Sequence, residues 1–113
     1  FTACVFHHID PGEHGFWLSE IRRVLRPGGL FVLFEHNPLN PLTLHAVNTC
    51  PFDENAILIR NSEMRKRFRA ANWNAPSSRF HVFFPSILKV MRPTERFLEW
   101  LPLGGQYSIS AVR

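Results

Sequence analysis

The chain has 113 residues, enough for one domain or part of one, and 45% of them are hydrophobic, which excludes a wholly disordered protein. Its 13 lysine and arginine residues outnumber its 9 acidic residues, giving a formal charge of +4. The arginines occur in small groups within helical patterns, which indicates solvated helix faces rather than a nucleic-acid surface.

Two cysteines, Cys4 and Cys50, are too few for a disulfide framework. No apolar run approaches the ~18 residues that a membrane span requires. The sequence begins at Phe1 rather than at Met and shows no signal peptide. We therefore expect a fragment of a cytoplasmic protein without a membrane partner.

A helix is predicted over residues 13–26. Its arginines lie toward the carboxyl end, where the helix dipole favours cations, and a Pro-Gly-Gly sequence stops it at residues 27–29. Four apolar residues recur at helical spacing and are expected to face the core: Trp17, Ile21, Val24 and Leu25.

The next stretch, residues 30–34, is an uninterrupted apolar run and predicts a strand buried on both faces. Glu35, His36 and Asn37 follow at its carboxyl end. Because ligands of open α/β sheets collect just beyond such strand ends, we expect part of a functional site here.

The remaining sequence predicts further helices and strands. Two Asn-Pro steps between residues 37 and 41 indicate a shaped loop, followed by one or two helical turns at 43–48. A helix is predicted from an N-cap at Ser62 through a stripe of Met64, Phe68 and Ala71. A strand at 79–84 should end at Pro85, before short helices at 86–91 and 93–100 and an alternating strand at 106–112. This order indicates an α/β fold.

These elements resemble the second half of class I S-adenosylmethionine-dependent methyltransferases. The resemblance is carried by the segment Phe6-His7-His8-Ile9, by the helix end Ile21-Arg22-Arg23-Val24-Leu25-Arg26-Pro27-Gly28-Gly29, and by the strand that follows. It implies a sheet with the family order 3-2-1-4-5-7-6. Residues 1–4 would be the tail of the fourth strand, and residues 30–34, 80–84 and 106–112 the fifth, sixth and seventh.

The resemblance also implies that the amino-terminal, cofactor-binding half of the domain is absent. Residues 1–113 would form a single partial domain without the family's glycine-rich loop and acidic ribose-binding residue. We therefore expect S-adenosylmethionine to be the cofactor of the parent protein, and to bind this chain weakly or not at all.

Candidate site residues follow from the same matching. Thr2 and Ala3 occupy positions that lie against the cofactor. The expected substrate-binding residues sit at the carboxyl edge of the sheet: His7, His8, Glu35, His36, Asn37 and Asn40. A histidine there could act as a general base or a substrate ligand, or could simply bond to backbone, and Glu35 could form a structural salt bridge. No catalytic residue is identified.

No metal site is predicted. No cysteine or histidine pair has a usable ligand spacing with a matching second pair, and the adjacent rings of His7 and His8 are expected to point apart.

Two functions remain open at this point. The first is the substrate-side half of a methyltransferase pocket, with an unidentified small-molecule methyl acceptor. The alternative is a non-enzymatic α/β module that self-associates through an exposed sheet edge. For either, the unpaired edge predicts a homo-oligomer.

Overall fold

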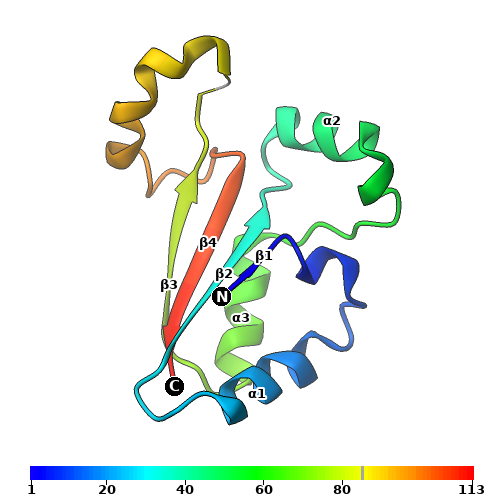
Figure 1. Cartoon of the computed structure of the whole chain (residues 1–113), viewed down its shortest axis with the longest axis vertical. Helices are drawn as coiled ribbons and strands as arrows, with labels where there is room; N and C mark the ends of the chain where they lie inside the picture. The colour runs from blue at the N-terminus through cyan, green and yellow to red at the C-terminus, as the bar shows by residue number, and fades with distance from the viewer. Residues whose placement is uncertain (85) are drawn as a thin grey trace.

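The computed structural model describes residues 1–84 and 86–113 (Figure 1). In this part of the chain no helix combines the length and apolar character needed to cross a membrane. The fold is mixed α/β, with these elements in chain order: β1 (Thr2–Ala3), η1 (Phe6–His8), α1 (His14–Val24), β2 (Leu30–His36), α2 (Pro41–Thr49), η2 (Pro51–Asp53), α3 (Asn61–Ala70), β3 (Asn74–His81), η3 (Ser86–Phe97) and β4 (Gln106–Val112).

The four strands form one sheet in the order β1-β2-β4-β3. β1 runs parallel to β2, whereas β4 is antiparallel to both β2 and β3. Leu33 at the centre of β2 lies opposite Thr2 on one side and Ile109 on the other. This arrangement confirms the order 4-5-7-6 that the resemblance predicted.

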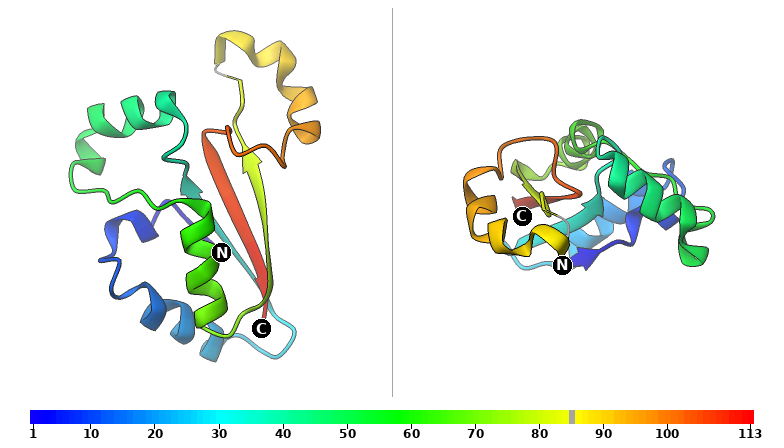
Figure 2. Two further views of the ribbon diagram at one scale, coloured as in Figure 1. Left: turned by 180° about the vertical axis from the view of Figure 1, so that it is seen from behind. Right: turned by 90° about the horizontal axis from the view of Figure 1, so that it is seen from above.

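Helices α1 and α3 form a layer on one face of the sheet. Helix α3 lies behind the strands in Figure 1 and in front of them in the reversed view of Figure 2, with α1 beside it. Phe31 and Leu33 of β2 are buried toward this layer, and the Phe31 ring stacks on Phe68 of α3 at 5.8 Å. Val32 and Phe34, which alternate with them, are only partly buried. The prediction of a strand buried on both faces is therefore wrong.

Helix α1 buries a different face from the predicted one. Ile21 and Leu25 pack against the core as expected, but Trp17 is 44% exposed and Val24 is 70% exposed. Their places are taken by His14 and Leu18, which are fully buried. The face is rotated because the His14 imidazole makes buried hydrogen bonds that draw it inward.

Strand β3 begins and ends earlier than predicted. It includes Pro76, which lacks a backbone donor but is tolerated because β3 is an edge strand with a bulge between Asn74 and Ser77. The amides of Phe83 and Phe84 leave the ladder and donate to the Glu95 carboxylate. Pro85, the predicted end of the strand, lies outside the described residues.

The remaining helices lie near their predicted positions, but their ends differ from the predicted ones. In α3, Met64 and Phe68 are fully buried as predicted, but the N-cap position is Arg60 and not Ser62. Helix α2 extends beyond the predicted turns at both ends. Two short helices are present near the carboxyl end as expected, but they are 3-10 helices within η3 and meet at a kink at Leu88.

Candidate functional site

A pocket of about 380 Å³ lies beyond the carboxyl end of β2, against helix α2 and the start of β4. Its volume is within the range of small-molecule sites. Most of its wall is apolar, and its polar or reactive lining residues are His36, Asn40, Thr43, Cys50, Asp53 and Gln106. The position is the one at which open α/β sheets bind their ligands.

Asn37 shapes the loop that leaves β2 and does not line this pocket. Its fully buried amide donates to the carbonyls of Pro102 (3.0 Å) and Gly104 (2.7 Å), and its Oδ1 accepts from the amide of Leu39 (3.1 Å). These bonds join the loop after β2 to the turn before β4. Asn37 thus holds the edge of the sheet together.

Asn40 has two structural contacts and also lines the pocket. Its Oδ1 caps helix α2 by accepting from the amides of Leu42 (2.9 Å) and Thr43 (3.0 Å), and its Nδ2 donates to the Leu103 carbonyl (2.8 Å). Such a cap fixes the first turn of a helix. Asn40 therefore sets where α2 begins over the pocket.

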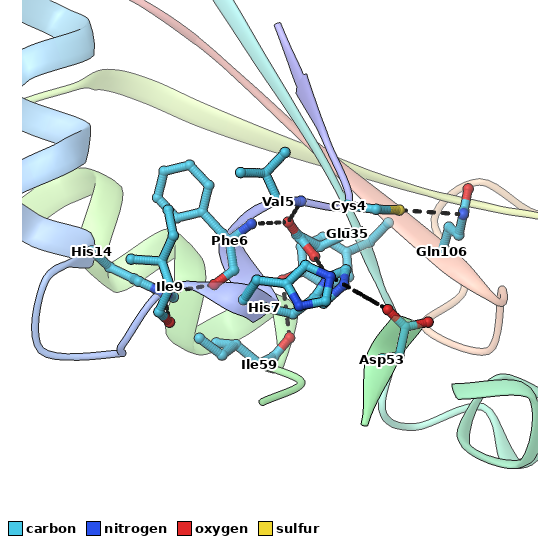
Figure 3. Close-up of polar contacts among 12 residues, drawn as sticks. Cys4, Val5, Phe6, His7, Ile9, His14, Glu35, Asp53, Ile59 and Gln106 are labelled. Atoms are coloured by element: carbon cyan, nitrogen blue, oxygen red, sulfur yellow. Dashed lines mark hydrogen bonds and ion pairs between the residues drawn. The ribbon is translucent and has the colours of Figure 1, made fainter. Parts of the chain in front are cut away.

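Glu35 lies within β2 and is buried on the helix-covered side, not in the pocket wall. Its Oε1 accepts from the amides of Val5 (3.0 Å) and Phe6 (2.7 Å), and its Oε2 lies 2.6 Å from Nδ1 of His7 (Figure 3). Of the alternatives open from the sequence, the structure shows the salt bridge. Glu35 fixes the 3-10 turn η1 against the sheet.

His7, His8 and His36 gather around Asp53 of η2. The Nε2 atoms of His7 and His8 lie 3.3 Å and 3.4 Å from Oδ1 of Asp53. The ring centroids of His7 and His8 are only 4.1 Å apart, so the expectation that they point apart is wrong. A 3-10 turn rather than an extended chain carries both residues, and this brings the rings to one side.

The pKa values of these residues are shifted by burial and by the charges and hydrogen bonds of their neighbours. Burial tends to lower the pKa of His7, but the hydrogen bond and charge of Glu35, with those of Asp53, outweigh it and raise the pKa. Burial tends to raise the pKa of Asp53, but bonding from Cys50 and His7 lowers it. Burial and then the charge of His7 lower the pKa of His36.

Thr2 and Ala3 make up β1 and pair with Leu33 and Phe34. The Oγ1 atom of Thr2 is buried and has no hydrogen-bond partner within residues 1–84 and 86–113. Both residues lie at the edge of the sheet, away from the residues that line the pocket.

Two residues of this region were missed by the sequence reasoning. Asp53 lies in a stretch that shows only loop composition, and its contact with His7 spans 46 positions. His14 donates from Nε2 to the carbonyls of Phe6 (2.9 Å) and Ile9 (3.0 Å), while Arg67 donates to its Nδ1 (2.7 Å). Burial, and then the charge of Arg67, lower the pKa of His14.

Two solved structures share this fold. A SAM-dependent methyltransferase from Archaeoglobus fulgidus aligns with a TM-score of 0.73 over 98% of this chain and 57% of its own, at 14% identity. A SAM-dependent methyltransferase from Thermotoga maritima, titled a possible histamine N-methyltransferase, aligns with a TM-score of 0.64 over 92% and 49%, at 18% identity. No family model and no curated protein matches the sequence.

The chain spans about half the length of these two structures. Its strand order is the one that the family shows for its fourth, fifth, seventh and sixth strands. The 113 residues therefore adopt part of the class I S-adenosylmethionine-dependent methyltransferase fold.

Proposed function

We propose that this chain supplies the substrate-side half of an S-adenosylmethionine-dependent methyltransferase. The observation that supports this most directly is the pocket of about 380 Å³ at the carboxyl end of β2, on a fold shared with two such enzymes. A small polar methyl acceptor would fit a pocket with apolar walls and a few polar groups. Of the six expected substrate-binding residues, His36 and Asn40 line it and are proposed to contact the acceptor.

The other four expected residues do not line this pocket. Glu35 and Asn37 are buried and hold the adjoining backbone in place. His7 and His8 reach the pocket through Asp53, which lines it. Asp53 therefore joins His36 as a proposed contact for a polar or cationic group of the acceptor.

The residues present do not by themselves fit S-adenosylmethionine. In the described part of the chain no strand is followed by a glycine-rich loop, since Gly28-Gly29 and Gly104-Gly105 both precede strands. The buried, unpartnered hydroxyl of Thr2 agrees with a further group bound at β1, and we propose Thr2 and Ala3 as cofactor neighbours in the parent protein. Methyl transfer depends mainly on positioning two substrates, which half a pocket cannot do.

Calorimetric titration of the 113-residue chain with S-adenosylmethionine tests the cofactor part of the proposal. We expect no saturable binding at micromolar concentrations. Tight binding would contradict the assignment of this chain to the substrate side.

The acceptor part is tested on the full-length gene product with labelled S-adenosylmethionine and a panel of small amines, alcohols and carboxylates. Ala46→Trp on the exposed face of α2 should fill the pocket and lower methyl transfer at least about tenfold, because a pocket ligand would lose its space. Asn48→Trp, on the same helix but outside this pocket, is the matched control. Transfer unaffected by Ala46→Trp would show that the acceptor binds elsewhere.

A further inference from the structure

Three potential metal-ligand atoms converge beside the pocket. His7, His8 and Asp53 each offer one ligand atom, and these three atoms lie within 4.8 Å of one another. Imidazole nitrogen and carboxylate oxygen are ligands that zinc accepts in proteins. We propose that His7, His8 and Asp53 bind a divalent transition-metal ion, with zinc the best fit.

The distances match the spacing of ligands around a tetrahedral ion. Ligand atoms about 2.0–2.1 Å from a tetrahedral zinc lie about 3.3–3.4 Å from each other. The Asp53 oxygen is 3.3 Å from the His7 nitrogen and 3.4 Å from the His8 nitrogen. Two of the three distances between ligand atoms therefore already match those around a tetrahedral zinc ion. The third distance is at most 4.8 Å, and a small rotation of the half-exposed His8 side chain would shorten it.

Glu35 gives the group the outer partner that metal-bound histidines usually have. Its Oε2 lies 2.6 Å from Nδ1 of His7, so Nδ1 can donate to the carboxylate while Nε2 faces Asp53 and would bind a metal in place of its proton (Figure 3). Glu35 is itself fixed by the amides of Val5 and Phe6. The His7 ring is thus held in the orientation that a metal at Nε2 requires.

The site leaves one coordination position for another ligand. Three protein ligands with a fourth position open are typical of zinc sites that bind water or a substrate group. Asp53 also lines the pocket, so an ion held by it would lie at the pocket wall. Metal binding does not depend on the proposed methyltransferase function and is tested separately.

The EDTA-treated chain is titrated first with Co²⁺, and binding is followed by visible absorption spectroscopy. It is then titrated with Zn²⁺ in a calorimeter. We expect one ion per chain, Co²⁺ bands that Zn²⁺ displaces, and no comparable binding of Mg²⁺, which prefers oxygen ligands. Absence of saturable Co²⁺ and Zn²⁺ binding would overturn the proposal.

Two variants locate the site. His8→Ala removes a half-exposed ligand and should lower Zn²⁺ affinity at least about tenfold, since even outer partners of metal ligands contribute that much. Its urea unfolding transition shows whether it remains folded. His45→Ala removes an exposed histidine of α2 outside the group and should bind like the wild type. Wild-type affinity in His8→Ala, or equal losses in both variants, would refute the site.

Discussion

Glu35 and His7 form a buried pair, 2.6 Å apart from Oε2 to Nδ1, that links the second-last residue of β2 to the turn after β1. Both side chains are almost completely buried. The second oxygen of Glu35 accepts two backbone amides of the same turn. The Glu35 carboxylate thus fixes both the backbone of this turn and the imidazole of His7, which belongs to the turn.

Replacing Glu35 should destabilise the fold strongly. Glu35→Ala leaves two amides and one imidazole without their buried acceptor, and breaking such a pair costs about 3–5 kcal/mol in the free energy of unfolding. Urea unfolding followed by tryptophan fluorescence measures the loss. Glu54→Ala, at an exposed position, should change stability by less than about 0.5 kcal/mol. A loss below about 1 kcal/mol in Glu35→Ala would show that water replaces the carboxylate.

Substituting alanine at two of the glycines should change the free energy of unfolding in opposite directions. A Cβ at Gly104 would lie 2.5 Å from the carbonyl oxygen of His81, so Gly104→Ala must move backbone and should cost about 1–3 kcal/mol. A Cβ at Gly15 of α1 meets nothing within 4 Å, so Gly15→Ala should stabilise the helix by about 0.5–1 kcal/mol. Thermal unfolding of both variants checks the pair. A stable Gly104→Ala protein would mean that the turn before β4 adjusts freely.

The sheet could be predicted from the sequence because its signals are local. The pattern Arg-Pro-Gly-Gly before an apolar run marks a helix end and a strand start within a few residues, and the strand order followed from the resemblance. The start of β3 could not be predicted in this way. Pro76 reads as a strand breaker, and only its edge position and the neighbouring bulge make it acceptable.

The residues that line the candidate pocket could be predicted in part, for a related reason. His36 and Asn40 are near the end of one strand, and strand ends can be located from sequence. Asp53 reaches His7 across 46 positions, and His14 reaches Arg67 across 53. Contacts of that separation depend on the packing of whole elements, which no local pattern contains.

The buried ring of Phe68 should be a main source of stability. It is fully buried and packs against both Phe31 and Trp73, so Phe68→Ala should lower the free energy of unfolding by about 3–5 kcal/mol. The same substitution at Phe52, which is 90% exposed, should change it by less than about 0.5 kcal/mol. Chemical denaturation compares the two. Equal effects would mean that α3 does not pack on the sheet as the structure describes.

His14 should make stability depend on pH. The folded state keeps its imidazole neutral, with a pKa below the usual 6.5, because it is buried and accepts a hydrogen bond from Arg67. Above pH 6.5 the His14 imidazole is neutral in both the folded and the unfolded chain, so it does not make stability depend on pH there. As the pH falls through 6.5, the unfolded chain takes up a proton that the folded chain does not, so stability falls by at most about 1.4 kcal/mol per pH unit. The loss levels off below the folded-state pKa.

His14→Gln isolates this effect, because it removes this imidazole and no other titratable group. Urea unfolding at about pH 7.5 and about pH 5.5 should show a steeper loss in the wild type than in the variant. The variant itself will be less stable at both values, since glutamine cannot reproduce all three buried hydrogen bonds. Parallel losses would show that His14 can be protonated in the folded chain.

The amino-terminal edge of the sheet should drive self-association. β1 pairs with only two residues of β2, so the backbone of Leu30–Val32 extends past it, and Leu30 is 60% exposed. Such an edge tends to pair with another copy of the chain. Light scattering at micromolar concentration should therefore give a mass above that of the monomer, and Leu30→Lys should lower it by placing charge on the edge. Ile87→Lys, at an exposed apolar residue of η3, should leave the mass unchanged. A monomeric wild type would rule out this edge as an interface.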